Sequence, residues 1–102
     1  MLQSISIIGN VVADAELRKG RDGRDFVSFK VAVNETVGDE KRCTYYDVSC
    51  PSSPVQKYLK KGQLVYVSGK VTLSAVLHEG RAYLNARISA KDIELCGGQK
   101  DR

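Results

Sequence analysis

Tryptophan is absent from this sequence of 102 residues, histidine and methionine occur once each, and proline occurs twice. With His78 as the only histidine and no paired carboxylates in a recognisable motif, little is available for acid–base catalysis. The chain lacks G-x-S-x-G and H-E-x-x-H, and its Gly…Gly-Lys pattern from Gly62 to Lys70 has six intervening residues where a P-loop has four. We therefore expect a protein that is not an enzyme.

A cysteine motif is also absent. The three cysteines, Cys43, Cys50 and Cys96, are odd in number and have no C-x-x-C spacing. That pattern does not favour a disulfide framework or a zinc site. We expect reduced thiols, and neither a metal nor another cofactor.

Long apolar runs are missing as well. No stretch approaches the ~20 apolar residues that span a bilayer, and the N-terminus lacks the basic segment and apolar core of a secretion signal. A cytoplasmic protein of one domain is expected from a chain of this length with 42% apolar residues. Sixteen basic residues against twelve acidic ones give a net charge of +4, which permits a polyanionic partner without requiring one.

Alternating apolar and polar residues indicate β-strands in most of the chain. The five predicted strands are residues 4–12, with a kink or bulge at Gly9, and residues 26–34, 43–50, 65–73 and 82–90. The polar segments 14–25 and 35–42 are expected to be loops, and residues 78–81 a hairpin turn. Lys91-Asp92 is expected to interrupt the last strand before residues 93–95 resume pairing.

One short helix is predicted between the third and fourth strands. Ser53 suits the N-cap and Pro54 the first helical position. Residues 55–59 carry an apolar stripe, Lys60 and Lys61 would occupy the last turn, and Gly62 would end the helix. Strand, strand, strand, helix, strand, strand is the order of the OB-fold, a five-stranded Greek-key barrel. Because side chains fill such a small barrel, binding would use its outer face and loops.

Several segments also resemble a known family at the right order and spacing. They are Ile5-Ser-Ile-Ile-Gly-Asn10, Asp14-Ala-Glu-Leu-Arg18, Phe29-Lys-Val-Ala-Val-Asn34, Tyr58-Leu-Lys-Lys-Gly62 and Val65-Tyr-Val-Ser-Gly-Lys-Val71. Together they resemble the bacterial single-stranded-DNA-binding protein family (SSB), over nearly the whole chain. The resemblance implies an OB-fold domain at residues 1–96 that binds single-stranded DNA in replication, recombination or repair. The polar composition of residues 97–102 predicts a flexible tail after this domain. The resemblance also implies self-assembly, with a tetramer favoured over a dimer, contacts with replication or repair proteins, and a nucleoid-associated location in the cytoplasm.

The chain departs from the family pattern in two ways. Members stack bases on about four aromatic residues, whereas only Tyr45 keeps a ring here and the other places hold Val37, Pro51 and Val76. Members also often carry an acidic tail with a Pro-Phe tip. Residues 97–102 do not contain such a tail, which is either naturally absent or trimmed.

With fewer stacking residues, we expect binding to depend on cations that contact phosphates, with limited stacking, strong salt dependence and little sequence preference. The residues predicted to contact DNA are Tyr45, Lys30, Asn34, Arg42, Lys70, Arg81, Tyr83, Arg87, Arg18 and Arg24. Tyr58 and Phe29 are expected to pack in the core.

Two alternatives stay open at this point. The first is a primosomal accessory protein, a dimeric relative of the same fold that binds single-stranded DNA and a helicase. The second is an OB-fold protein-interaction module that has lost strong DNA binding, because fold does not fix function.

Overall fold

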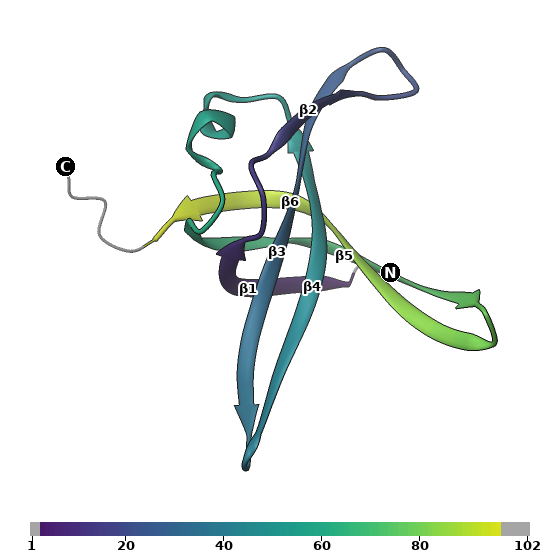
Figure 1. Ribbon diagram of the computed structural model, residues 1–102. Helices are drawn as coiled ribbons and strands as arrows, with labels where there is room; N and C mark the ends of the chain where they lie inside the picture. Colours follow the sequence, from purple (N-terminus) through teal and green to yellow (C-terminus); the bar gives the residue numbers. More distant parts are fainter. Residues whose placement is uncertain (1–2, 97–102) are drawn as a thin grey trace.

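The computed structural model describes residues 3–96, without the side chains of residues 83 and 84, and places almost all of this range in strands (Figure 1). The elements are β1 (Ser4–Val11), β2 (Glu16–Lys19), β3 (Asp25–Val37), β4 (Glu40–Pro51), the 3-10 helix η1 (Pro54–Tyr58), β5 (Leu64–His78) and β6 (Arg81–Leu95). None of the helical residues in this range forms a helix long and apolar enough to cross a membrane. The tail predicted at residues 97–102 lies outside the described residues.

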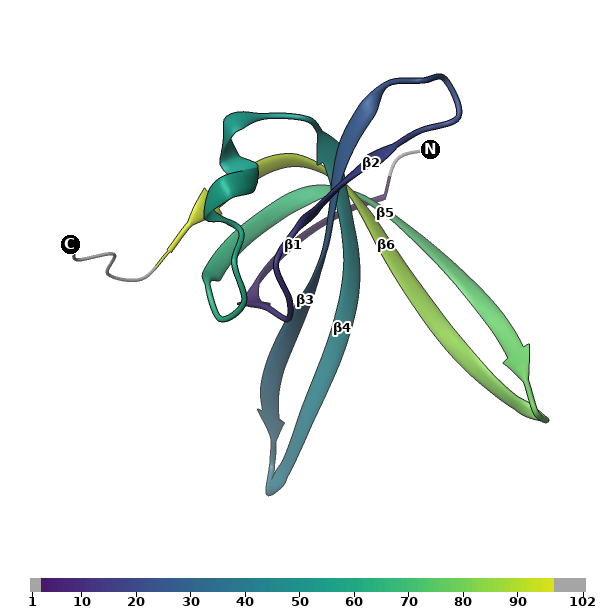
Figure 2. The same ribbon diagram turned by 45° about the horizontal axis from the view of Figure 1, so that its top comes forward.

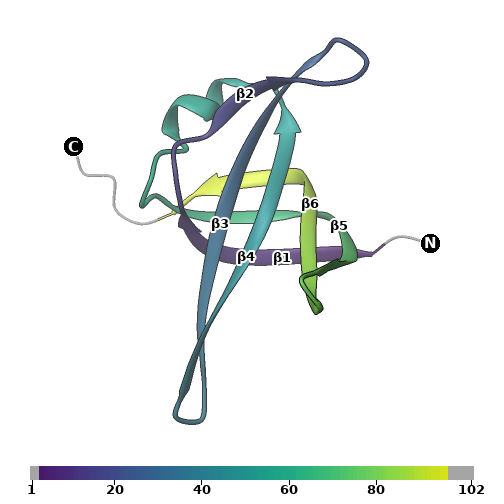
Figure 3. The same ribbon diagram turned by 45° about the vertical axis from the view of Figure 1, so that its right-hand side comes forward.

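The strands form a closed barrel. The barrel strands are ordered β1-β5-β6-β4-β3. The barrel closes because β1 also pairs with β3, through Asn10 with Ala32 and Val11 with Val31. The β4–β6 pairing is parallel and the others are antiparallel. Figure 3 shows β3 and β4 crossing over β1, β5 and β6 at a steep angle. The predicted all-β OB-fold with one short helix between the third and fourth barrel strands is confirmed.

The barrel interior is a continuous apolar core, as the alternation of residues predicts. Its buried members are Ile7, Val11, Val27, Phe29, Val31, Val48, Leu59, Val65, Val67 and Ile88. Because each of these points inward, the neighbouring residues of β3, β4 and β6 point outward. The core therefore decides which side chains form the outer face.

Two hairpins extend beyond the barrel as arms, formed by the ends of β3–β4 and of β5–β6 (Figure 2). The β3–β4 arm turns at Gly38-Asp39, where Gly38 has φ 62°. The β5–β6 arm turns at Glu79-Gly80, both with positive φ, which is typical of a tight two-residue hairpin. The predicted turn at residues 78–81 is confirmed. The predicted loop at residues 35–42 is wrong in extent, because pairing continues to Val37 and Glu40.

The segment 14–25 is not only a loop, contrary to expectation. Residues Glu16–Lys19 form β2, which pairs with the start of β3. All four residues are exposed, so there is no apolar alternation by which the sequence would reveal a strand. A hairpin turn follows, in which Gly23 has φ 83°.

The predicted helix is shorter than expected. It ends at Tyr58, and Lys60 and Lys61 lie beyond it in a turn. The amide of Lys61 donates to Oδ1 of Asp14 at 2.9 Å instead of to a helical carbonyl. Leu59 is buried as predicted, but Tyr58 is 51% exposed and does not pack in the core.

The expected interruption of the last strand is a β-bulge. Ser68 pairs with Asp92 and Gly69 with Ala90, so Lys91 is the extra residue. Gly69 is required here because a Cβ on it would collide with the carbonyl oxygen of Ser89. A Cβ at Gly9 would likewise collide with the carbonyl of Ala32. Gly9 lies next to the point at which β1 changes its pairing partner from β5 to β3.

Candidate nucleic-acid interface

Outward side chains of β3, β4 and β6 are aligned in rows across the strands. One row is Lys30, Asp47 and Arg87. The next row holds three hydroxyls, those of Ser28, Ser49 and Ser89, and the third pairs Phe26 with Pro51. We call these three rows the outer face.

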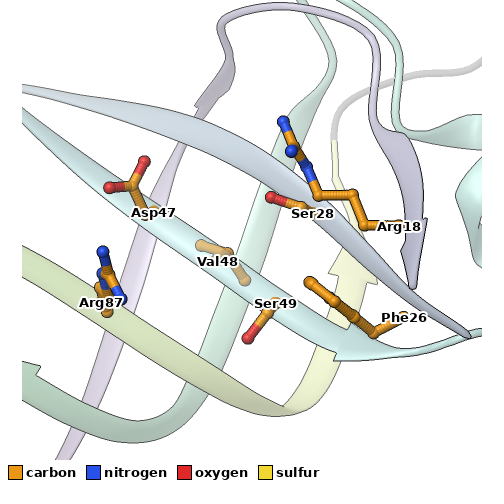
Figure 4. A pocket seen from close by; sticks show the side chains of 7 residues that line it. All are labelled: Arg18, Phe26, Ser28, Asp47, Val48, Ser49 and Arg87. Carbon is orange, nitrogen blue, oxygen red and sulfur yellow. The ribbon is translucent and has the colours of Figure 1, made fainter. Parts of the chain in front are cut away.

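The outer face is hollowed where β2 adjoins it. A depression of about 420 Å³ is lined by Arg18, Phe26, Ser28, Asp47, Val48, Ser49 and Arg87 (Figure 4). A second depression of about 330 Å³ adjoins it and also includes Phe26 and Ser49, together with Arg24 from the β2–β3 hairpin. We call the two adjoining depressions the groove. Three of the predicted DNA-contacting cations line it, namely Arg18, Arg24 and Arg87.

The predicted DNA-contacting cations differ in how they are paired. Nζ of Lys30 lies 3.8 Å from Oδ1 of Asp47. Arg18, Arg24 and Arg42 each contact an acid two residues away, at 2.7, 3.7 and 3.2 Å. All these groups are exposed. Because exposed ion pairs contribute little to stability, a DNA phosphate can replace the carboxylate as the partner of the cation. Within the described part of the chain, Arg87 makes no ion pair.

Tyr45 stands on the same side of the sheet. It lies opposite Ala32, one outward row beyond Lys30 and Asp47, and is 56% exposed. The side chain of Cys43 raises the pKa of the Tyr45 phenol above its ordinary value through a hydrogen bond and a charge interaction. The phenol therefore keeps its proton to higher pH than an ordinary tyrosine, and its exposed ring is accessible for stacking.

Other predicted residues lie away from the groove. Asn34 and Arg42 line a separate depression of about 410 Å³ on the β3–β4 arm. Arg81 is at the tip of the β5–β6 arm. Lys70 pairs with Ser89, but it lines a depression on the β1 side of the barrel. Tyr83 pairs with Val76 through its backbone, and its side chain lies outside the described part.

The positions where the family pattern places aromatic rings remain exposed in this chain. Val37 is 49% exposed on the β3–β4 arm and Val76 is 43% exposed on the β5–β6 arm. Pro51 is exposed opposite Phe26. These side chains are accessible but offer no ring for stacking.

Three features of the groove were not predicted as site residues: the ring of Phe26, the row of serine hydroxyls and the carboxylate of Asp47. The parity of β3 contained a signal for the first, since Phe26 shares its face with Ser28 and Lys30. The serine row depends on the register between three strands, which no single segment reveals. Among residues 3–96, no group of three or more histidine, cysteine, aspartate or glutamate side chains could hold a metal ion.

Solved structures with this fold include nucleic-acid-binding proteins. The small single-stranded DNA-binding protein from Streptomyces coelicolor superposes with a TM-score of 0.76 at 21% identity, covering 93% of this chain and 94% of that one. The Plasmodium falciparum SSB in complex with ssDNA superposes with a TM-score of 0.71 at 20% identity, covering 95% and 96%. At these identities the likeness establishes the fold.

Sequence relatives extend the comparison. Single-stranded DNA-binding protein 1 of Xylella fastidiosa is 28% identical and covers 98% of this chain and 81% of its own length. The single-stranded DNA-binding protein of Halalkalibacterium halodurans is 29% identical over 92% of this chain, which spans only 60% of that relative. The model of the single-strand binding protein family matches residues 2–96. The chain therefore belongs to the single-strand binding protein family.

Proposed function

We propose that this protein binds single-stranded DNA without sequence specificity and protects it during replication, recombination or repair. The observation that carries the proposal is the outer face, where Lys30 and Arg87 share one row beside the groove and Tyr45 lies on the next outward row beyond them. Cations that follow a backbone and a ring that stacks on bases are the two elements of non-specific single-strand binding. Membership of the family supports the same function.

Phosphate contacts are proposed to dominate the affinity. Arg18, Arg24 and Arg87 flank the groove, and each cation that binds a phosphate releases counterions, so affinity falls as salt rises. Serine hydroxyls can donate or accept hydrogen bonds. They therefore fit any base edge, which agrees with little sequence preference.

Stacking is proposed to be the smaller contribution. Each base stacked on an aromatic side chain is worth about 1–3 kcal/mol, and Val37, Pro51 and Val76 replace rings in the family pattern. We therefore expect weaker and more salt-dependent binding than in members with a full aromatic set.

Self-assembly is also proposed, as a tetramer in preference to a dimer. Ile8 is 57% exposed on β1, and its cross-strand partner is Tyr66. Exposed apolar side chains on an outer sheet face suit a contact with a second copy. Sedimentation at concentrations used for DNA binding distinguishes the two states, and a dimer would favour the primosomal alternative.

The proposed setting follows from the same function. We assign residues 1–96 to the DNA-binding domain and place the protein in the cytoplasm with the nucleoid, where it would meet replication or repair proteins.

Fluorescence anisotropy with a labelled oligo-dT tests the proposal, against a duplex of similar length at low and physiological salt. We expect tighter binding to the single strand and a linear fall of log K with log salt. Removing one phosphate-binding cation by Arg87→Gln should flatten that slope by about 0.7. Lys57→Gln, on η1, makes the same charge change away from the groove and should leave it unchanged. Equal affinity for the duplex, or no binding at low salt, would overturn the proposal.

A further inference from the structure

We propose that Phe26 is a second base-stacking residue and that the groove beside it holds one nucleobase. This inference rests on the proposed function and goes beyond the family pattern, in which the other stacking places of this chain are Val37, Pro51 and Val76.

The position of Phe26 separates it from the core. Val27 and Phe29 are buried in the barrel, whereas Phe26 points outward and is half-buried. It lies in register with Arg18 on β2 and Pro51 on β4. In Figure 4, Phe26 and Arg18 lie at one end of the groove, while Asp47 and Arg87 lie at the other. The ring thus belongs to the binding surface.

Space for a base exists beside the ring. Phe26 and Ser49 together line both depressions, of about 420 and 330 Å³. These volumes lie at the lower end of the ~300–1,000 Å³ typical of small-molecule sites. The turn at Gly20 adjoins the ring, since a Cβ built there would lie 3.7 Å from Cδ1 of Phe26. The turn therefore leaves open space beside the ring, where a residue other than glycine would place its Cβ.

The polar groups around Phe26 match the rest of a nucleotide. Ser28 and Ser49 present hydroxyls next to the ring, and these can donate to or accept from a base edge. Arg18 and Arg24 supply cations on the side of the β2–β3 hairpin. Their contacts with Glu16 and Asp22 are exposed, so a phosphate can displace them. A ring, hydroxyls and cations are therefore gathered at one subsite.

Phe26 and Tyr45 are far enough apart to take different bases. Tyr45 lies opposite Ala32, and positions 26 and 32 of β3 differ by six residues, or about 20 Å along a strand. At the ~3.4 Å per nucleotide of one duplex strand this distance corresponds to about six nucleotides, and an extended single strand spans it with fewer. An oligonucleotide of two or three nucleotides should occupy one ring, and a dozen should reach both.

A single-tryptophan experiment tests the subsite. Because the chain has no tryptophan, Phe26→Trp introduces one reporter, whose emission should be quenched when a base of a twelve-nucleotide oligo-dT stacks on it. Tyr45→Trp is the parallel reporter at the other stacking residue. Tyr58→Trp is the control, because Tyr58 is exposed on η1 and lines neither depression.

Affinity provides the second readout. Phe26→Leu keeps apolar volume but removes the ring, and should weaken oligo-dT binding roughly 5- to 150-fold, the equivalent of one stacked base. Phe26→Trp should retain wild-type affinity. Thermal unfolding of both variants checks the fold, and the tryptophan signal remains decisive if the leucine variant is unstable.

The outcomes separate the subsite from the proposed function. Quenching at position 26 without quenching at position 58 supports the subsite. Quenching at position 45 alone, with normal binding by Phe26→Leu, overturns the subsite and leaves the proposed function intact. Failure of the wild-type protein to bind oligo-dT overturns both.

Discussion

Lys30 and Asp47 lie directly opposite each other in the β3–β4 ladder, with Nζ of Lys30 3.8 Å from Oδ1 of Asp47. Asp47 is in turn the parallel-strand partner of Arg87. One carboxylate therefore stands between two cations on a face that we propose binds phosphates. The Asp47 carboxylate neutralises part of the positive charge of this face and would repel the phosphate backbone of an approaching DNA strand.

Asp47→Asn should strengthen binding to single-stranded DNA. The substitution removes the repulsion and releases Lys30, and exposed charge interactions of about 0.2–1 kcal/mol correspond to a roughly 1.5- to 5-fold gain in affinity. The gain should shrink as salt screens the charges. Glu94→Gln is the matched control, because Glu94 is exposed on β6 opposite Tyr66. Weaker binding by Asp47→Asn than by wild type would mean that the carboxylate itself binds the DNA.

Tyr45→Ala should weaken binding by about 1–3 kcal/mol in the same anisotropy assay, because one stacked base is lost. Tyr45→Phe keeps the ring and should bind like wild type. Since Cys43 raises the pKa of Tyr45, the phenol loses its proton only above its ordinary range, and binding should show no Tyr45-dependent change between pH 7 and 9. Equal losses for the alanine and phenylalanine variants would point to the hydroxyl instead of the ring.

The thiols of Cys43 and Cys50 should differ in reactivity. Cys43 is exposed, whereas Cys50 is half-buried and its pKa is raised by that burial. A raised pKa lowers the thiolate fraction at a given pH, and the thiolate is the reactive form. Iodoacetamide at pH 7.5, followed by peptide mass spectrometry, should modify Cys43 faster. Saturating oligo-dT should slow the alkylation of Cys43, because Cys43 adjoins Tyr45. Denaturation should make the alkylation rates of Cys43 and Cys50 similar.

Gly69→Ala should destabilise the barrel by about 1–3 kcal/mol, the cost typical of overpacking. A Cβ at Gly69 would collide with the backbone carbonyl of Ser89, and both strands would have to shift at the bulge. At Gly20 the nearest atom to a Cβ is Oδ1 of the Asp22 side chain, at 3.2 Å, which can move. Urea unfolding should therefore show a loss within about 0.5 kcal/mol for Gly20→Ala. Equal losses would contradict this role of Gly69.

The strands that line the core were predictable from the sequence because burial imposes alternation. Val27, Phe29 and Val31 show this pattern, and all three are buried. β2 was not predictable, because pairing with β3 alone defines it and none of its side chains is buried. The predicted helix was too long at its C-terminal end for a related reason. Lys60 and Lys61 suit a helical last turn by charge, but Asp14, distant in sequence, binds the backbone there and ends the helix earlier.

The candidate interface was predictable only in part. Alternation correctly places Lys30, Tyr45 and Arg87 among the exposed residues, and their contacts with DNA remain predictions. The alignment of Lys30, Asp47 and Arg87 depends on the register of β3, β4 and β6. The parallel β4–β6 pairing in particular joins segments that no local turn connects. Residues brought together by such long-range pairing cannot be found from local patterns.

We propose that single-stranded DNA binds across the outer face of β3, β4 and β6. Amide chemical-shift mapping of the isotopically labelled protein with a twelve-nucleotide oligo-dT would locate the bound strand. We expect the largest shifts in three groups: Phe26 to Ala32, Tyr45 to Ser49, and Arg87 to Ser89. Shifts confined to β1 and the turn at residues 60–63, or none at saturating DNA, would contradict it.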